Sequence, residues 1–289
     1  MSTSPAIERT LSGRSRIAGV MGWPVSHSRS PRLHGYWLRR YGIDGCYIPL
    51  PVRPEDFAAA LRALPKLGFA GANVTVPHKE AALATVDRVN AEAHRMGAVN
   101  TIVVAADGTL EGRNSDGFGF IENLRSSVAD WRARAGPAAI VGAGGAARAV
   151  AVALIDAGVP ELRLINRTVE RAERLAGDVG GPIQVYGWPE RARAMADVAL
   201  LVNTTTLGMA GQPPLELDLA SLPTAAVVND VVYSPLATPL LAAAEARGNR
   251  VVDGLGMLLH QARPGFAAWF GIEPEVTPEL RRFVLDMPV

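Results

Sequence analysis

The stretch AAIVGAGGAARAVAVALIDAG at residues 138–158 decides the predicted fold. Its apolar start predicts a buried strand, its glycines a tight turn, and its alanine-rich continuation a helix ending near Gly158. The turn matches the pattern GxGxx(G/A), which binds a dinucleotide pyrophosphate where a strand leads into a helix. Gly142 permits the turn, Gly144 lets a pyrophosphate approach the backbone, and Ala147 still allows close helix packing. The helix N-terminus adds amide hydrogens for the anion. The predicted phosphate-binding residues are Gly142, Ala143, Gly144, Gly145 and Ala146.

Strand-like and helix-like segments alternate regularly beyond this stretch. Residues 161–166 predict a strand and residues 168–176 a helix. Further strand candidates are Ile183–Tyr186, Val198–Val202, Ala226–Val231 and Arg250–Val252, and helices are expected at Gly256–Phe270 and Pro278–Asp286. This βαβ rhythm predicts a Rossmann-like parallel sheet.

The second strand of this half indicates which dinucleotide binds. NAD-binding units carry an acidic residue roughly 20 positions beyond the glycines, which binds the ribose 2′-hydroxyl. Here the strand ends in Asn166-Arg167-Thr168, without Asp or Glu. Arg167 is suited to grip a 2′-phosphate, and Arg171, one helical turn later, could join it. The sequence therefore predicts NADP as the cofactor. The alternative is that both arginines are solvated at a helix start.

The first 115 residues predict a second α/β region. Strands are expected at 17–21, 46–49 and 71–76, and helices at 30–42 and 54–67. Ser30 is the expected N-cap and Pro31 the first residue of the first helix. Pro77 is expected to open another helix, which would make Lys79 its third residue. Residues 98–113 predict a β-hairpin turning at Asp107-Gly108, and Phe118–Arg134 a connecting helix. We expect two α/β domains with the active site between them.

Composition excludes several other classes of protein. The formal net charge of +1 over 289 residues gives no electrostatic reason for binding nucleic acid or an anionic membrane. A single cysteine, Cys46, fits a reducing compartment, and the N-terminal residues lack the apolar core of a signal peptide. Five scattered histidines show no metal-ligand spacing. We expect a cytoplasmic protein that binds a small molecule, with no metal, nucleic acid or membrane partner.

Lysine is rare in this chain, since only Lys66 and Lys79 are lysine among 29 basic residues. Arginine does not release its proton in proteins, whereas a lysine amine can. Hydride reduction of a ketone requires a proton for the oxygen, so a protein with a hydride carrier needs a proton donor. Lys79, which closely follows the strand-like run NVTV at 73–76, is the candidate, and Asp116 in NSDG at 114–117 is its candidate partner.

Several blocks of sequence together resemble the shikimate dehydrogenase family. They are SHSRSP at 26–31, NVTVPHK at 73–79, AVNT at 98–101, NSDG at 114–117, GAGGAAR at 142–148, NRTVERA at 166–172, DVVYSP at 230–235 and DGLGMLLHQA at 253–262. The resemblance covers nearly the whole chain. It implies NADP-dependent interconversion of 3-dehydroshikimate and shikimate in aromatic amino acid biosynthesis. It also implies an α/β substrate domain with a mixed, mainly parallel sheet (1–115 plus 255–289) and a Rossmann-like NADP domain (116–254).

The resemblance assigns roles residue by residue. Ser26 and Ser28 match the serines that hold the substrate carboxylate, and Tyr233 matches a tyrosine near the same end. Lys79 and Asp116 match the catalytic pair. The positions that match contacts to the ring hydroxyls are Thr75, Asn100, Asp116 and Gln261, with Asn73 close by. The positions expected beside the cofactor are Thr204, Gly254 and Met257.

Less specific interpretations stay open for several of these residues. Ser26 and Ser28 could cap a helix, Asn73 and Asn100 could fasten loop backbones, and Asp116 could be a helix N-cap. Tyr233 could be packing, and His78 is interpreted as structural or, at most, as a neighbour of the cofactor. The alternative functions are a quinate/shikimate dehydrogenase that uses NAD and a non-catalytic regulator that binds shikimate or NADP. Both a monomer and a homodimer are compatible with the sequence.

Overall fold

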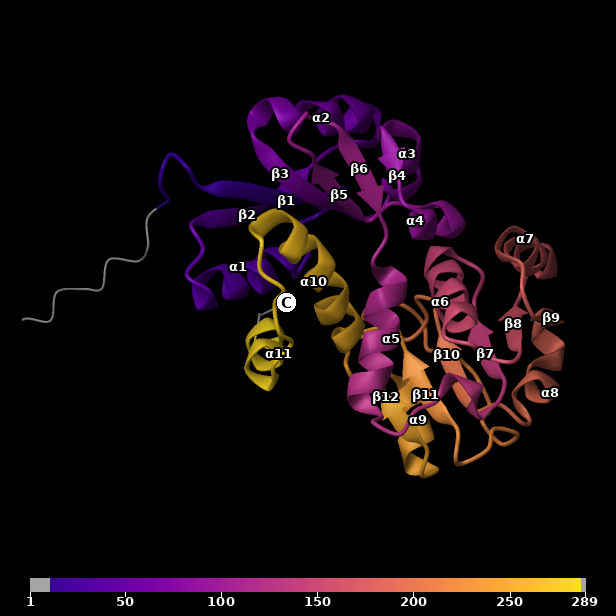
Figure 1. Ribbon diagram of the computed structural model, residues 1–289. Coiled ribbons are helices and arrows are strands. Elements are labelled where there is room, and N and C mark those ends of the chain that lie inside the picture. The colour runs from indigo at the N-terminus through magenta and orange to yellow at the C-terminus, as the bar shows by residue number, and fades with distance from the viewer. Residues whose placement is uncertain (1–10, 287–289) are drawn as a thin grey trace, which may run out of the picture. The chain divides into compact units, whose positions relative to one another are not determined.

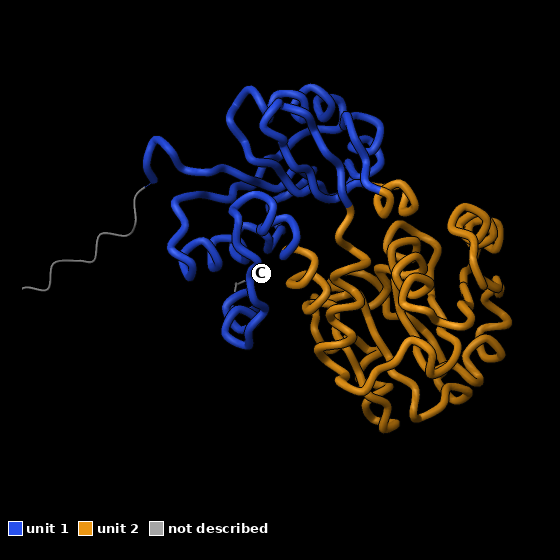
Figure 2. Tube along the Cα trace, viewed as in Figure 1, with its two compact units in different colours: residues 1–90, 99–113, 263–289 blue, residues 91–98, 114–262 orange. Residues whose placement is uncertain are grey.

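The computed structural model describes residues 11–286, and the chain divides into two compact units (Figures 1 and 2). Unit 1 comprises residues 1–90, 99–113 and 263–289, and unit 2 comprises residues 91–98 and 114–262. Each unit contains a six-stranded sheet with helices. The predicted α/β class is therefore confirmed.

Unit 1 is built on a mixed sheet with the strand order β2-β1-β3-β5-β6-β4. Its strands are β1 (Arg16–Gly22), β2 (Gly45–Pro51), β3 (Phe69–Val74), β4 (Arg88–Val89), β5 (Thr101–Val104) and β6 (Leu110–Arg113). The pairs β1–β2, β1–β3 and β4–β6 are parallel, and β3–β5 and β5–β6 are antiparallel. The mixed, mainly parallel sheet and the hairpin turning near Asp107-Gly108 agree with the sequence prediction.

Helices pack on this sheet through an aromatic core. They are α1 (Ser30–Arg40), α2 (Phe57–Ala63), α3 (Lys79–Thr85), α11 (Pro278–Leu285) and the second half of α10 (Leu255–Phe270), with short 3₁₀ turns η1 (Pro54–Asp56) and η2 (Pro65–Leu67). Trp37, Phe266 and Trp269 are fully buried, and the rings of all three lie against His34. The indole of Trp269 donates a 2.8 Å hydrogen bond to the carbonyl of Ile102, across Gly71, where any side chain would collide with the ring. The single helix expected at 54–67 is observed as three shorter elements, η1, α2 and η2, and the last of them begins at Pro65.

Unit 2 contains an entirely parallel sheet in the order β9-β8-β7-β10-β11-β12. Its strands are β7 (Ala138–Val141), β8 (Leu162–Asn166), β9 (Ile183–Gly187), β10 (Leu200–Asn203), β11 (Val227–Asp230) and β12 (Arg250–Val252). In chain order this is the doubly wound arrangement 3-2-1-4-5-6, in which ligands bind where the order reverses, here beside β7 and β10. The predicted Rossmann-like sheet is confirmed.

Both faces of this sheet are buried. Successive side chains of a strand point to opposite faces, and each face is covered by its own cluster of apolar residues. Ala138 and Ile140 of β7 belong to one buried cluster, and Ala139 and Val141 belong to the other. Helices α5 (Asp116–Ser127), α6 (Gly145–Asp156) and α7 (Val169–Val179) contribute to the first cluster, and α8 (Arg191–Met195) and α9 (Pro239–Ala246) to the second. The remaining elements are α4 (Ala91–Met96), η3 (Ala133–Ala135), η4 (Trp188–Glu190) and the first half of α10.

Some expected boundaries differ from the observed ones. The connecting helix expected at 118–134 is α5, which ends at Ser127, and only a short 3₁₀ turn follows at Ala133. Helices α4, α8 and α9 were not predicted. Residues 91–98 and 255–262 cluster with unit 2, although the sequence placed them with the substrate domain.

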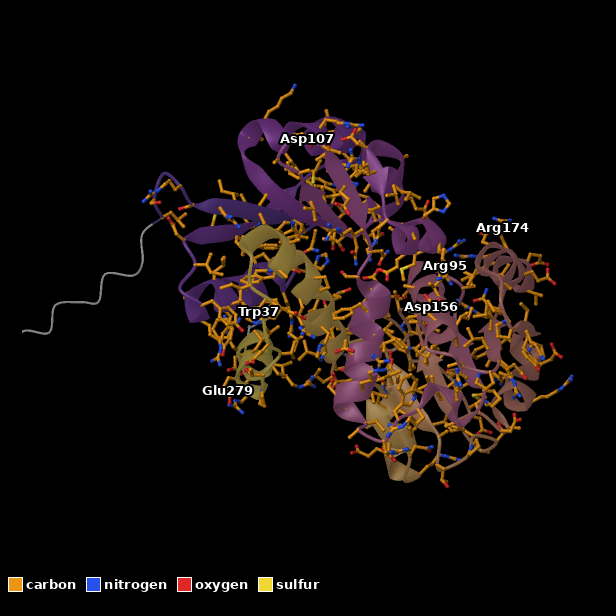
Figure 3. All side chains as sticks on the ribbon, viewed as in Figure 1. Trp37, Arg95, Asp107, Asp156, Arg174 and Glu279 are labelled. Carbon is orange, nitrogen blue, oxygen red and sulfur yellow. The ribbon has the colours of Figure 1, made fainter. Side chains whose placement is uncertain are left out.

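The packing of α4 explains its place in unit 2. Met96 packs against Ala149 and Val152 of α6. Arg95 forms an ion pair with Asp156 at 2.9 Å, and the two side chains lie together in Figure 3. Both contacts join residues that are far apart in the sequence, so the sequence pattern around α4 did not predict them.

Candidate active site

In unit 1, the segments that follow β1 and β3 are tied together at the carboxyl edge of the sheet. The amide of Trp23 donates to the carbonyl of Val76 at 3.1 Å, and the amide of Thr75 donates to the carbonyl of Met21 at 2.9 Å. Gly22 permits this approach, because a Cβ there would lie 2.5 Å from Cγ2 of Thr75. The sheet therefore places Thr75 beside the start of the loop that leads to the two predicted serines.

Ser26 and Ser28 line a cavity of about 540 Å³ between this loop, α1 and α11. Arg32, Arg39 and Phe283 line it too. The guanidinium of Arg32 lies 4.0 Å from the Phe283 ring centroid, and its Nε donates to the Phe283 carbonyl at 2.5 Å. Hydroxyl and guanidinium groups both suit a carboxylate ligand. The two arginines were not predicted, since they become neighbours of the serines only through the turn of α1.

The start of α1 differs from the sequence prediction. Arg29 occupies the N-cap position, Ser30 is the first helical residue, and Pro31 follows. The hydroxyl of Ser28 accepts a 3.3 Å hydrogen bond from the amide of Ser30, so Ser30 is not the N-cap and its amide is bound by the preceding loop. This bond uses the Ser28 oxygen as an acceptor and leaves its O–H hydrogen able to donate to a ligand.

Asn73 of β3 is engaged by protein groups on both sides of its amide. Its oxygen accepts a 2.7 Å hydrogen bond from the hydroxyl of Tyr47, and its nitrogen donates to the carbonyl of Asn100 at 3.1 Å and the hydroxyl of Thr101 at 3.2 Å. This arrangement supports the interpretation that Asn73 fastens the backbone beside the site. The buried side chain of Asn100 accepts a 2.8 Å hydrogen bond from Thr101.

A neutral aromatic layer lies behind these amides. The rings of His34 and Tyr47 stack with their centroids 4.0 Å apart. Burial lowers the pKa of His34 to about 3 and raises the pKa of Tyr47 well above its ordinary value. Both side chains are therefore uncharged at neutral pH, and neither places a charge behind Asn73.

Lys79 is the first residue of α3, and not the third as predicted from the sequence. The amide of His78 donates to the carbonyl of Thr75 at 2.9 Å, so Pro77 lies inside a tight turn and the helix begins two residues later than expected. The carbonyl of Lys79 accepts a 3.0 Å hydrogen bond from the amide of Val99, which places Lys79 beside the strand entry at Asn100. The structure brings these two predicted site residues together.

His78, next in sequence to the lysine, is structural, as the sequence suggested. Its ring is buried, lies 2.8 Å through Nε2 from the carbonyl of Val52, and stacks on Phe57 with centroids 4.4 Å apart. These contacts occupy the ring within the core of unit 1.

In unit 2, the glycine turn has the space that a pyrophosphate requires. Gly142 has a φ of +114°, and a Cβ there would lie 2.7 Å from the hydroxyl oxygen of Thr204. Around Gly144 and Gly145, in contrast, no atom of residues 11–286 other than the adjoining backbone lies within 4 Å of an added Cβ. Gly144 is the N-cap of α6, whose first amide groups have no partner within the helix. The turn thus combines an open surface with amide donors, which suits a phosphate.

A cavity of about 470 Å³ opens beside this turn. Three predicted residues line it: Gly142, Asn166 and Arg167. Residues that the sequence analysis missed complete the lining, chiefly Trp188, Arg191, Thr205, Thr206, Leu207 and Glu216. These residues follow β9 and β10. Ligands bind at the carboxyl ends of parallel strands, and applying this rule to the two predicted strands would have identified them.

The other predicted cofactor residues do not line this cavity. Thr168 is the N-cap of α7, and Arg171 is exposed on that helix. The hydroxyl of Thr204 donates to the carbonyl of Val141 at 2.7 Å, which joins the β7 and β10 ends. Met257 packs in a buried cluster, and Gly254 lies against the end of β11, where a Cβ would be 2.2 Å from the carbonyl of Val231.

Asp116, Gln261 and Tyr233 also belong to unit 2. Asp116 is buried at the first turn of α5, and its amide donates to the side chain of Asn114 at 2.9 Å. Ser115 is the N-cap there, so the alternative that Asp116 caps the helix is wrong. The amide oxygen of Gln261 is buried and has no hydrogen-bond partner among residues 11–286. Such an atom is satisfied when a ligand donates to it.

Fold and site together define the class of protein. A doubly wound sheet with an open glycine turn and a cavity containing Arg167 is a dinucleotide-binding unit. A separate α/β unit presents hydroxyl, amide and amine groups. These features are typical of nicotinamide-dependent oxidoreductases with a distinct substrate domain.

The chain belongs to the shikimate dehydrogenase family. Residues 20–102 match the family model described as shikimate dehydrogenase substrate binding domain, and residues 126–207 match the model described as shikimate / quinate 5-dehydrogenase. A curated relative, the shikimate dehydrogenase (NADP(+)) of Paramagnetospirillum magneticum, is 65% identical over 276 residues, which cover 96% of this chain and 100% of the relative.

Solved structures agree with this assignment. A shikimate 5-dehydrogenase from Thermus thermophilus in complex with NADP(H) and shikimate is similar with a TM-score of 0.84 and 36% identity, covering 93% of this chain and 98% of that chain. A quinate dehydrogenase from Corynebacterium glutamicum in complex with NAD is similar with a TM-score of 0.88 and 32% identity, covering 94% and 99%.

Proposed function

We propose that this protein catalyses the reversible, NADP-dependent reduction of 3-dehydroshikimate to shikimate, a step in aromatic amino acid biosynthesis. The observation that carries the proposal is the 65% identity, over 96% of the chain, to a curated NADP-dependent shikimate dehydrogenase. The groups that this chemistry requires are present in the sequence, including a titratable lysine at position 79 and a glycine turn at 142–145.

The residues of unit 2 fit NADP. The open space at Gly144 and Gly145, with the first amides of α6, suits the pyrophosphate. Arg167 supplies a planar guanidinium for the 2′-phosphate in the cavity beside that turn. When bound, NADPH supplies the hydride for the ketone carbon. The chain's own residues supply the binding groups and the proton.

The carboxylate of the substrate is assigned to Ser26 and Ser28. Their hydroxyls donate hydrogen bonds to the carboxylate, and the cavity that they line also contains Arg32 and Arg39, which favour an anion there. Tyr233 is assigned to the same end of the substrate. Because 3-dehydroshikimate and shikimate carry the same carboxylate, these contacts hold both sides of the reaction equally and fix the orientation of the ring.

The ring hydroxyls are assigned to Thr75, Asn100 and Gln261. The buried oxygen of Gln261 is an acceptor for a substrate O–H. Thr75 and Asn100 lie at the ends of neighbouring strands, since Asn100 accepts the 2.8 Å backbone hydrogen bond of Val74. Asn73 supports them through its bonds to Asn100 and Thr101.

Lys79 and Asp116 are assigned as the catalytic pair. As hydride reaches the ketone carbon, negative charge develops on the oxygen, and the ammonium group of Lys79 donates a proton to it. In the reverse direction the neutral amine accepts the proton of the hydroxyl. Asp116 accepts a hydrogen bond from a substrate hydroxyl and so helps to orient the reacting carbon.

A second candidate function is quinate dehydrogenation with NAD, which the similarity to the quinate dehydrogenase of Corynebacterium glutamicum favours. Arg167 favours NADP over NAD, as does the lack of an acidic residue at the end of β8, where the sequence is Asn166-Arg167-Thr168. Initial rates with shikimate and with quinate, each with NADP and with NAD, test both. Turnover of shikimate with NADP supports the proposal. Faster turnover of quinate with NAD would assign the second function, and no turnover by folded protein would contradict both.

A further inference from the structure

The cavity beside the glycine turn contains a second guanidinium group, that of Arg191. Arg167 directly follows β8 and Arg191 is the first residue of α8, and both line the cavity. The strand register explains why Arg167 and Arg191 line the same cavity, because Asn166 of β8 pairs with Gly187 of β9. The chain therefore leaves the two strands at the same level, and the short turn η4 brings it to Arg191.

Trp188 holds Arg191 in place. One terminal nitrogen of Arg191 donates a 2.8 Å hydrogen bond to the carbonyl of Trp188, and the guanidinium carbon lies 4.9 Å from the centroid of the Trp188 ring. Trp188 itself packs against the buried cluster on that face of the sheet. An arginine fixed in this way loses less side-chain freedom when a ligand binds.

The charge around the cavity favours an anion. Across residues 11–286, no carboxylate lies within the 4.0 Å ion-pair distance of Arg167 or Arg191. Glu190, next to Arg191, is turned toward other groups: it accepts a 3.2 Å hydrogen bond from the amide of Gly187 and lies 3.7 Å from Arg193. The acidic residue in the lining is Glu216, which is exposed. Two positive charges thus face one solvated negative charge.

We propose that Arg191 binds the 2′-phosphate of NADP together with Arg167. The inference rests on the proposed function, which supplies NADP as the ligand. With the pyrophosphate at the glycine turn, the 2′-phosphate is the remaining anionic group of NADP, and a planar guanidinium binds it through two hydrogen bonds. Arg171, the second arginine expected from the sequence, does not line the cavity. Arg191 is therefore a determinant of the preference for NADP.

The test measures the binding of two nucleotide fragments to the full chain by calorimetry, without any turnover. The fragment 2′,5′-ADP carries the phosphate, and 5′-AMP lacks it. Arg191→Gln is expected to weaken binding of 2′,5′-ADP about tenfold or more, because it removes charge-assisted hydrogen bonds. Binding of 5′-AMP is expected to change less than twofold. Arg191→Lys keeps the charge but loses the planar pair of donors, so its affinity for 2′,5′-ADP is expected to lie between those of wild type and Arg191→Gln.

Arg193→Gln is the matched control on the same helix. Arg193 is exposed, lies outside the cavity lining, and contacts Glu190 and Tyr186, so its replacement is expected to leave both affinities unchanged. Equal losses of 2′,5′-ADP and 5′-AMP in Arg191→Gln would overturn the inference, as would a selective loss in Arg171→Gln alone. If wild type itself binds both fragments equally, the NADP preference in the proposed function fails. That result is distinct from a failure confined to Arg191.

Discussion

The hydroxyl of Tyr47 donates a 2.7 Å hydrogen bond to the side-chain oxygen of Asn73. This bond fixes the amide so that its nitrogen faces the carbonyl of Asn100 and the hydroxyl of Thr101. Thr101 in turn donates to the side-chain oxygen of Asn100 at 2.8 Å. A continuous chain of hydrogen bonds therefore runs from Tyr47 to Asn100, a predicted substrate ligand. We therefore expect Tyr47 to act as a positioning residue for Asn100.

Replacing Tyr47 with phenylalanine should disturb this chain without removing a ligand. Tyr47→Phe leaves the oxygen of Asn73 without its donor, and the amide is no longer held in one orientation. We expect KM for shikimate to rise several-fold, and the free energy of unfolding to fall by about 1 kcal/mol, the usual value of one hydrogen bond. Initial-rate kinetics and urea unfolding measure the two effects.

Tyr186→Phe is the control for Tyr47→Phe. It removes a similar bond, from the Tyr186 hydroxyl to Gln184 at 2.9 Å, in unit 2. It should change the stability slightly and leave KM for shikimate unchanged. If Tyr47→Phe behaves in the same way as this control, the hydrogen-bond chain does not position Asn100.

Lys79→Ala should reduce turnover much more than substrate binding. Loss of a general acid–base group costs about 10²- to 10⁴-fold in kcat. Lys79→Arg keeps the positive charge, but its guanidinium does not release a proton, so we expect it to be nearly as slow. Lys66→Ala is the matched control, because Lys66 is the other lysine of the chain and is exposed on η2. Full activity of Lys79→Arg would show that charge alone suffices and that Lys79 is not the proton donor.

The fold of unit 2 follows from local signals in the sequence. The apolar run 138–141, the glycines that follow it and the alanine-rich helix specify β7, the turn and α6 within one continuous stretch. The alternating burial of Ala138 to Val141 between the two sheet faces is what a central parallel strand requires. Arg167 was predicted as a cofactor residue because it directly follows β8, another strand of this parallel sheet.

The parts of the site that were missed depend on contacts between distant residues. Arg191 follows the edge strand β9, and only the pairing of Asn166 with Gly187 brings it near Arg167. The engagement of Asn73 depends on Tyr47, 26 positions earlier. The start of α3 was misplaced because a proline that can open a helix can also lie within a turn, as Pro77 does. Local sequence does not distinguish these cases.

Gly145→Ala should weaken NADP binding while leaving the fold intact. Apart from the adjoining backbone, no atom in the described part of the chain lies within 4 Å of an added Cβ at Gly145, and the residue is helical, so alanine should not reduce stability. A methyl group would nevertheless occupy the space assigned to the pyrophosphate. We expect the Kd of NADP to rise about tenfold or more, by calorimetry.

Gly177→Ala provides the comparison for Gly145→Ala. Gly177 is a helical glycine of α7 that also has open space around its Cβ position. Alanine there should stabilise the protein by about 0.5–1 kcal/mol and leave the Kd of NADP unchanged. Equal NADP affinity in the two variants would mean that the pyrophosphate does not approach Gly145.

Asp230, at the end of β11, should make a pH-dependent contribution to stability. Its carboxyl group is buried, which raises its pKa, although hydrogen bonds from Thr238, the amide of Val232 and Asn203 act in the opposite direction. The folded state therefore binds a proton more tightly than the unfolded state. The contribution of Asp230 to the free energy of unfolding should be greatest below its ordinary pKa, about 4, and should decline as the pH rises through the higher folded value.

Asp230→Asn isolates this effect, because the amide cannot ionise. Other carboxyl groups, such as Asp197 and Glu111, have pKa values lowered by neighbouring arginines and act in the opposite direction, but they are common to both proteins. Their contributions cancel when urea unfolding of wild type is compared with that of the variant at each pH from 4 to 8. The stability of wild type relative to the variant should decrease with rising pH and then level off. A difference that increases with pH would show that the hydrogen bonds outweigh burial and that the pKa of Asp230 is lowered.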